Sequence, residues 1–287
     1  MSSLICEPLH ADFGASVTGV ALGEPMSDEQ ISDVKAAIDE YSLLVFPGQE
    51  MTDEAQLAFT SQLGEPEANH VLLGRTGERQ YIGTIGNISA DGSQRGNDDL
   101  GVQYQRGNEL WHSDSSFREV PSYVTITHGY ETVDEGGATQ FVSGRAAYDR
   151  LSAEDKADFG DLEVIHDYVF SRSPVAPVHP AHAASLPPVV HPLVRVNPGN
   201  GRKNLFIGSH TRSVVGFEGI ASRELLDRLV AQAVEQEAIY SHQWTDNDTV
   251  IWDNRCLIHR GTPYDADRWR RLKRQTRVTG TEPGRLH

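Results

Sequence analysis

Short strand-like runs separated by turn residues constrain the fold of this 287-residue chain more than any other feature. These runs, a few residues long and rich in β-branched and aromatic residues, are typical of strands; they fall near 111–114, 123–130, 139–142, 189–196, 204–207, 239–244, 249–252 and 256–260. Helical periodicity marks 27–40, 52–63, 144–151, 153–159 and 222–235. We see no repeat, low-complexity tract or linker. The pattern therefore predicts one mainly β domain with peripheral helices (α+β), spanning residues 1–287.

Local signals set several boundaries. Ser27 and Thr52 precede acidic residues and are expected to cap the first two helices. Residues 83–107 are polar, rich in Gly, Asn and Asp, and are predicted to form a long loop, as a mobile lid over a site. Residues 171–188 hold five of the fourteen prolines and are predicted to be irregular.

Composition excludes several classes of protein. The formal net charge of −16 argues against non-specific binding to nucleic acid or to an anionic membrane. No apolar run reaches about 18 residues, so we expect no membrane span, and the N-terminus does not resemble a secretory signal. Cys6 and Cys256 give no disulfide framework, which favours a reducing, cytoplasmic location.

Two separated segments predict a metal site. On a strand, residues two apart point to the same face, so His112 and Asp114 can hold one ion together. His259, from a distant predicted strand, would complete a set of two histidines and one carboxylate, which suits non-haem Fe(II) with open positions. The chain has twelve histidines, and the tripeptide alone also fits ordinary polar roles.

A basic stretch near the C-terminus predicts an anion site. Between residues 268 and 277, the even positions Arg270, Leu272 and Arg274 would share one face of a strand, and Leu272 marks that face as the inner one. A buried arginine requires an anionic partner. Small carboxylates are the expected ligands, although a solvated charged strand is the simpler reading.

Several spaced motifs resemble the taurine dioxygenase (TauD/TfdA) family. The likeness lies in residues 110–117, 136–141, 145–148, 205–208 and 252–261, in that order. The family consists of Fe(II)- and 2-oxoglutarate-dependent oxygenases, and the strongest likeness is to the branch of 2,4-dichlorophenoxyacetate and related aryloxyalkanoate dioxygenases. The resemblance implies a double-stranded β-helix, or jelly-roll, core.

The resemblance also implies roles for individual residues. The family's iron ligands correspond to His112, Asp114 and His259. Its contacts to 2-oxoglutarate correspond to Thr139 and to Arg270, which would pair with the distal carboxylate of this co-substrate.

A second group would meet the prime substrate. By resemblance, Arg274 binds its anionic group, and Asn108 lies near substrate and co-substrate. His70 aligns, to within one residue, with a histidine that binds the sulfonate in the taurine enzyme.

The implied reaction is hydroxylation of a small anionic substrate. For an aryloxyalkanoate, hydroxylation beside the ether oxygen gives a phenol and an oxo acid, with O2 consumed and succinate and CO2 released. A taurine-like sulfonate or an alkyl sulfate is the alternative within the family. A zinc hydrolase and a metal-free jelly-roll binding module are alternatives of other classes. A homo-oligomer is expected, because family members often form dimers or larger assemblies.

Overall fold

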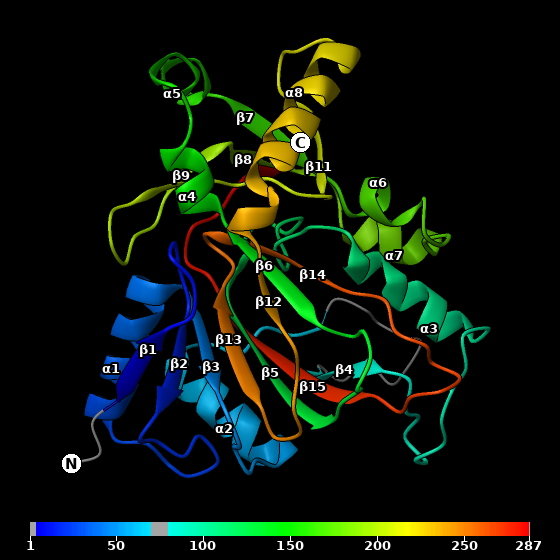
Figure 1. The fold of residues 1–287 in the computed structure, drawn as a ribbon. Helices are drawn as coiled ribbons and strands as arrows, with labels where there is room; N and C mark the ends of the chain where they lie inside the picture. The colour runs from blue at the N-terminus through cyan, green and yellow to red at the C-terminus, as the bar shows by residue number, and fades with distance from the viewer. Residues whose placement is uncertain (1–3, 70–79, 287) are drawn as a thin grey trace.

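The computed structural model describes residues 4–69 and 80–286, and its main element is a large sheet (Figure 1). The order across this seven-stranded sheet is β1 (Ile5–Pro8), β2 (Ala15–Thr18), β3 (Leu43–Phe46), β13 (Thr249–Asp253), β5 (Ser122–Glu131), β15 (Leu272–Thr279) and β4 (Gly83–Gly86). Neighbouring strands are antiparallel except for β2 and β3. Sequence neighbours are often distant in the sheet, so segments from the whole chain meet in it.

Smaller sheets accompany the large one. A three-stranded sheet has the order β12 (Tyr240–His242), β6 (Thr139–Ser143) and β14 (Leu257–Gly261). A four-stranded sheet has the order β11 (Thr211–Val214), β7 (Glu163–His166), β8 (Val189–Pro192) and β16 (Arg285–Leu286). The predicted hairpin after residue 189 is confirmed, because β9 (Val194–Val196) pairs antiparallel with β10 (Lys203–Leu205).

The helices lie around the sheets. They are α1 (Asp28–Tyr41), α2 (Asp53–Leu63), α3 (Leu100–Gln105), α4 (Gly144–Asp149), α5 (Ala153–Phe159), α6 (Tyr168–Arg172), α7 (Pro180–Ser185) and α8 (Gly219–Ala233), with 3-10 turns η1 (Arg106–Glu109) and η2 (Gln236–Ala238). The predicted caps are confirmed: the Ser27 hydroxyl accepts a hydrogen bond from the Gln30 amide, and that of Thr52 accepts one from Ala55. The predicted combination of sheets with peripheral helices (α+β) is therefore observed, but the helices hold about as many residues as the strands, so the fold is not mainly β.

Both faces of the large sheet are buried. In β3, Leu44 and Phe46 pack with α1 and α2 in one apolar cluster, which also holds Ile251 of β13. Leu43 and Val45 point the other way, into a second cluster that contains residues of β6, β13 and β14. Because alternate residues of a strand face opposite sides, a continuous apolar run is needed here. The space between the large and the three-stranded sheets holds the candidate site.

Three local predictions require correction. Residues 83–107 are not one long loop, because they contain β4 and α3. Residues 171–188 include the end of α6 and all of α7. Residues 111–114 do not form a strand: His112 makes a single bridge to His259, and Asp114 lies in a turn. Each difference involves short elements fixed by tertiary contacts rather than by local periodicity.

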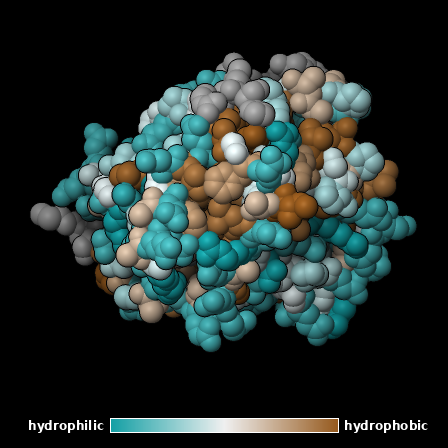
Figure 2. All heavy atoms as spheres, turned by 90° about the horizontal axis from the view of Figure 1, so that it is seen from above, coloured by the Kyte–Doolittle hydropathy of each residue, from teal (hydrophilic) through white to brown (hydrophobic). Residues whose placement is uncertain are grey.

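One face of the molecule combines a hydrophilic surround with a group of hydrophobic side chains (Figure 2). Seen from above, it is largely hydrophilic, with hydrophobic side chains gathered near the middle of this face (Figure 2). Phe170, Phe217 and Ile220, on or beside α6 and α8, are among the exposed large apolar residues. Within residues 4–69 and 80–286, no helix has the length and apolar character that crossing a membrane requires.

Candidate active site

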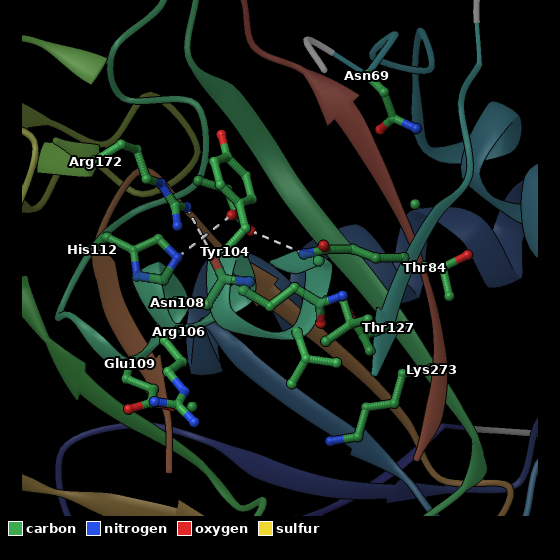
Figure 3. A pocket seen from close by; sticks show the side chains of 18 of the residues that line it. Asn69, Thr84, Tyr104, Arg106, Asn108, Glu109, His112, Thr127, Arg172 and Lys273 are labelled. Atoms are coloured by element: carbon green, nitrogen blue, oxygen red, sulfur yellow. Dashed lines mark hydrogen bonds and ion pairs between the residues drawn. The ribbon is translucent and has the colours of Figure 1, made fainter. Parts of the chain in front are cut away.

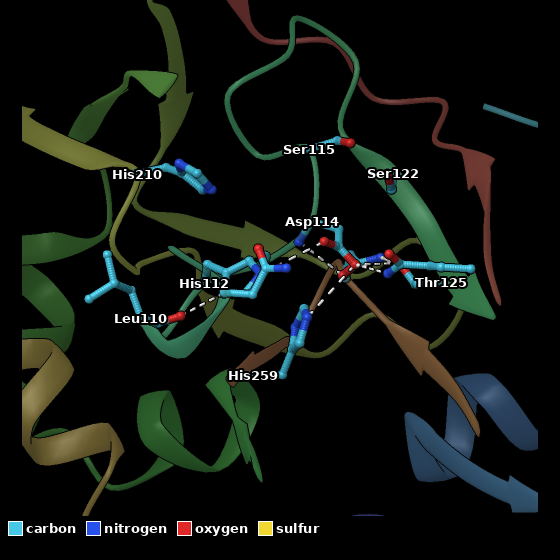
Figure 4. Close-up of polar contacts among 12 residues, drawn as sticks. Leu110, His112, Asp114, Ser115, Ser122, Thr125, His210 and His259 are labelled. Atoms are coloured by element: carbon cyan, nitrogen blue, oxygen red, sulfur yellow. Dashed lines mark hydrogen bonds and ion pairs between the residues drawn. The ribbon is translucent and has the colours of Figure 1, made fainter. Parts of the chain in front are cut away.

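His112, Asp114 and His259 converge at one point of the structure, as the sequence predicts. Their ligand atoms all lie within 4.8 Å of one another. Nε2 of His112 lies 3.8 Å from Oδ1 of Asp114, and Nε2 of His259 lies 3.8 Å from Oδ2 (Figure 4). Both histidines are buried, with 4% and 6% of their surface exposed. The three donor groups therefore face a common centre.

A bridge followed by a turn produces this convergence, and not a strand as the sequence predicts. The amide of His112 donates to the carbonyl of His259 at 3.0 Å, and the amide of His259 donates back at 2.8 Å. After Ser113, whose hydroxyl donates to the Leu257 carbonyl at 2.6 Å, the chain turns at Asp114 and enters a positive φ of 54° at Ser115. The turn brings the Asp114 carboxylate back toward both imidazoles.

The carboxylate of Asp114 is held by polar neighbours. Its Oδ2 accepts hydrogen bonds from the Thr125 hydroxyl at 2.7 Å and from Nε2 of Gln275 at 3.2 Å. Thr125 in turn accepts from Nδ2 of Asn254 at 2.8 Å, and the side-chain oxygen of Asn254 accepts from the Asp114 amide at 3.1 Å. Partners of this kind orient ligands and tune metal affinity.

The ionisation states suit metal binding. Burial lowers the pKa of His112, and burial together with His112 lowers that of His259 to about 3. Burial alone would raise the pKa of Asp114, but His259, His112, Arg277 and the Thr125 hydrogen bond together lower it. Nδ1 of His112 lies 2.6 Å from the Leu110 carbonyl, to which it can only donate, leaving Nε2 as a lone-pair donor. At neutral pH the site offers two neutral imidazoles and one carboxylate.

This donor set fits a divalent first-row metal. Two imidazoles and a carboxylate, all deprotonated, match the ligands of non-haem Fe(II), and three protein ligands leave positions open for other molecules. The donors were predicted from the sequence; their support by Thr125, Gln275 and Asn254 was not.

A cavity of about 750 Å³ opens beside the three donors. Much of its wall is apolar or aromatic, including Ile82, Val102, Tyr104, Phe117, Tyr168, Pro177 and Val178. Segments spread between Asn69 and Arg277 contribute to it, which explains why no single segment of the sequence reveals its shape. A cavity of this size, mostly apolar with a few polar groups, is typical of a small-molecule site.

Two buried cations line one part of the cavity. Arg271 donates from Nη2 to the Gly137 carbonyl at 3.2 Å and lies over the ring of Tyr264, while its Nε has no hydrogen-bond partner. Lys273 is 2% exposed, and its Nζ has no hydrogen-bond partner and lies 3.6 Å from the centroid of the Trp244 ring (Figure 3). No described carboxylate forms an ion pair with either cation.

Thr139 belongs to the same region. Its hydroxyl accepts a hydrogen bond from Nε1 of Trp244 at 2.9 Å, so Trp244 connects it to Lys273. Burial, and secondarily the charge on Arg271, lower the pKa of Lys273 well below its usual value, with Asp248 opposing. Buried, unpaired cations are costly. This end of the cavity therefore fits an anionic group of a bound molecule.

The prediction that Arg270, Leu272 and Arg274 face inward is wrong. Arg270 lies on the surface, where Nε donates to a carboxylate oxygen of Glu131 at 2.7 Å. Arg274 contacts Thr84 and lies 3.3 Å from Asp53, and neither arginine lines the cavity. A bulge between Leu272 and Lys273 shifts the pairing of β15 with β5, and the odd-numbered residues of β15 are the ones that face the cavity.

Of the three remaining predicted residues, two lie in the cavity and the third lies outside the described residues. Thr139 and Asn108 line the cavity, and Oδ1 of Asn108 accepts a hydrogen bond from Arg172 at 2.8 Å. His70 lies outside the described residues. Arg271, Lys273 and Arg172 were not predicted; the basic run contained the first two, but only the register of β15 distinguishes them from their neighbours.

Comparison with known proteins identifies the family. Residues 6–276 match the family described as "Taurine catabolism dioxygenase TauD, TfdA family". The chain belongs to the TauD/TfdA family. It is 35% identical over 279 residues to the alpha-ketoglutarate-dependent 2,4-dichlorophenoxyacetate dioxygenase of Cupriavidus pinatubonensis, covering 96% of this chain and 97% of that protein.

Two further comparisons support membership of the TauD/TfdA family. The (S)-phenoxypropionate/alpha-ketoglutarate-dioxygenase of Sphingobium herbicidovorans is 36% identical over 286 residues, covering 95% of this chain and 94% of that protein. The crystal structure of AAD-2 in complex with Mn(II) and N-oxalylglycine has a TM-score of 0.89 and 32% identity, covering 99% of this chain and 100% of that one. The predicted family is confirmed over nearly the whole length.

Proposed function

We propose that this protein is an Fe(II)- and 2-oxoglutarate-dependent dioxygenase that hydroxylates an aryloxyalkanoate. The observation that carries the proposal is the cavity, which combines two histidines and a carboxylate with a separate group of buried, unpaired cations. The first group suits a redox metal and the second suits a carboxylate. The relatives named for 2,4-dichlorophenoxyacetate and phenoxypropionate support this substrate class.

His112, Asp114 and His259 would hold the iron. The bound ion supplies the chemistry with O2, which no protein side chain can perform. Thr125 and Gln275 keep the Asp114 carboxylate in place by donating hydrogen bonds to its Oδ2. The burial of both imidazoles keeps them neutral and therefore free to bind a metal.

Arg271, Lys273 and Thr139 would bind the distal carboxylate of 2-oxoglutarate. Arg271 presents an unpartnered Nε, and Lys273 presents an unpartnered ammonium group. The Thr139 hydroxyl accepts from Trp244 and keeps its own proton to donate to the carboxylate. This assignment replaces Arg270 with its neighbour Arg271 and keeps Thr139 as the sequence predicts. It also offers Arg271 and Lys273 an ion-pair partner, because the described acidic groups that act on them, Glu109 and Asp248, form no ion pair with either.

The overall reaction balances without a protein acid or base. One O2 is consumed: one oxygen atom enters succinate as 2-oxoglutarate loses CO2, and the other is inserted into a C–H bond of the substrate. With phenoxyacetate, the hydroxylated carbon carries the ether oxygen, so the product is a hemiacetal. Its C–O bond to the ring oxygen breaks, giving phenol and glyoxylate. The protein's role is to orient the substrate and to exclude water.

The arrangement of the sheets and the state of the two cysteines also fit this proposal. The paired sheets around the site are compatible with a double-stranded β-helix core in a single domain, which we propose for residues 1–287. Cys6 and Cys256 are both free, and unpaired cysteines agree with the cytoplasmic location that we propose.

A metal and substrate assay tests this function. Anaerobic protein with Fe(II) and 2-oxoglutarate should develop a visible charge-transfer absorption that Zn(II) does not produce. With O2 and phenoxyacetate it should release succinate and phenol in equal amounts. Hydrolysis of the substrate with Zn(II) alone, without succinate, would contradict the proposal. Succinate release with alkyl sulfonates or alkyl sulfates, but not with phenoxyacetate, would retain the reaction and change the substrate class.

A further inference from the structure

Arg172 brings a positive charge to the cavity without an acidic partner. It is the last residue of α6 and lines the cavity. Its Nη2 donates to Oδ1 of Asn108 at 2.8 Å, and no described carboxylate forms an ion pair with it. A guanidinium group has five N–H donors in a planar fork. The contact with Asn108 occupies one of them, which leaves the others available to an anion.

The guanidinium group is held in place by its surroundings. Its central carbon lies 5.7 Å from the ring centroid of Tyr104 and 5.7 Å from that of Tyr168, and the hydroxyls of these two tyrosines hydrogen-bond to each other. A Cβ atom at Gly107 would lie 1.7 Å from Nη1 of Arg172. The two rings and the glycine therefore confine the fork to one position, as binding a planar anion requires.

This position lies beside the proposed metal site. Asn108, the partner of Arg172, lies four residues before His112, and Figure 3 shows Arg172 next to both. After burial, the charge on Arg172 is a further cause that lowers the pKa of His112. Lys273 lies away from this group in the same view. Arg172 and the Arg271–Lys273 pair are thus separate cationic groups in the cavity. Of the other arginines that line it, Arg95 and Arg277 form ion pairs with Asp99 and Glu67, and Arg106 is exposed. The proposed co-substrate needs only one cationic group for its distal carboxylate.

We propose that Arg172 binds the carboxylate of the prime substrate and so directs the neighbouring carbon toward the metal site at His112. The inference rests on the proposed function, and it names the residue that selects an acid as substrate. Apolar side chains near α6, including Phe117, Pro177 and Val178, line the same cavity and suit an aryl ring. Arg274, the predicted substrate arginine, points away from the cavity and cannot take this role.

Binding and turnover of matched ligands test the inference. We would measure the Kd of phenoxyacetate and of its neutral amide by calorimetry, in protein loaded with Mn(II) and 2-oxoglutarate without oxygen. Arg172→Gln should weaken binding of the acid by about 10- to 150-fold, the range for a hydrogen-bonded charge. The Kd of the amide and the KM for 2-oxoglutarate should change less than about twofold. Arg172→Lys, which keeps the charge without the fork, should retain part of the affinity.

Arg212→Gln is the matched control. Arg212 donates to Asp167, the cap residue of α6, but does not line the cavity. Equal weakening of acid and amide by Arg172→Gln, or the same loss in Arg212→Gln, would show that Arg172 only packs α6 and would overturn the inference. So would an unmodified protein that binds the amide as tightly as the acid. Failure of the proposed function is a different result, because the unmodified enzyme would then form no succinate from 2-oxoglutarate with any substrate.

Discussion

His112 and His259 donate a backbone hydrogen bond to each other, at 3.0 and 2.8 Å, although they lie far apart in the chain. This pair fixes the two imidazoles relative to one another before any metal binds. Their ring centroids are 4.3 Å apart, and both face Asp114. The candidate metal site is therefore built on a paired part of the backbone.

Replacing His259 with alanine should abolish turnover and remove bound iron. Loss of a direct ligand should cost more affinity than the roughly 10- to 100-fold that a supporting residue contributes. Metal content after dialysis and succinate formation would measure both effects. The control is His10→Ala, because His10 bonds the Glu237 carbonyl outside the cavity. Full activity in His259→Ala would refute the assignment of the ligand.

Thr125→Val tests the support of Asp114. The substitution keeps the shape of the side chain but removes the hydroxyl that donates to Oδ2 at 2.7 Å. Metal affinity should fall by about 10- to 100-fold, as measured by competition with a chelator. In the control, Thr132→Val, the lost hydroxyl donates to Asp246 away from the site. An unchanged affinity in Thr125→Val would mean that Gln275 alone orients the carboxylate.

The side chains of β15 that face the cavity could not be predicted from the sequence. Charged residues occupy both even and odd positions of β15 and of the two residues before it. Arg270 and Arg274 are at even positions, and Arg271 and Lys273 are at odd positions. The alternation of side chains along a strand predicts that one of these two sets faces inward. The bulge after Leu272 and the pairing with β5 determine which set it is. By contrast, the caps at Ser27 and Thr52 depend only on residues three positions away, and the sequence predicts both correctly.

Some residues of the candidate site could likewise be predicted from the sequence, and others could not. The grouping of His112, Asp114 and His259 was predictable because a short motif, a distant histidine and the family motifs around them together carry the signal. Arg172 carries no such signal, since its position depends on how the proline-rich residues 171–188 fold and on the space left by Gly107. Gln275 likewise reaches Asp114 only through the pairing of the strands.

Adjacent arginines provide a matched test of the co-substrate site. Arg271→Gln should raise the KM for 2-oxoglutarate by about 10- to 150-fold, the equivalent of roughly 1.5–3 kcal/mol for a hydrogen bond to a charged group. Arg270→Gln and Arg274→Gln remove surface charges and should leave this KM nearly unchanged. A large effect of Arg270→Gln with none of Arg271→Gln would reverse the assignment.

Lys273 should make the stability of the ligand-free protein depend on pH. Its pKa in the folded state is lowered well below 10.5, mainly by burial. Between that lowered pKa and the unfolded value, the unfolded chain binds more protons at Lys273, so its contribution to the free energy of unfolding rises as pH rises. Comparing denaturant unfolding of Lys273→Met and the unmodified protein across alkaline pH isolates this contribution, because the variant should lack it.

Lys273→Met should also stabilise the ligand-free protein while weakening co-substrate binding. Removing a buried amino group without a hydrogen-bond partner should gain on the order of 1–3 kcal/mol, and 2-oxoglutarate should lose affinity because the variant has no amino group to face its carboxylate. Burial lowers the pKa of Lys273 in the free protein, and a carboxylate beside it would raise that pKa, so binding should take up a proton. Calorimetry in buffers of different ionisation enthalpy would detect this uptake, which should vanish in Lys273→Met and persist in Lys203→Met, where the lysine is exposed. Equal proton uptake in both variants would exclude Lys273 as the group that responds to the co-substrate.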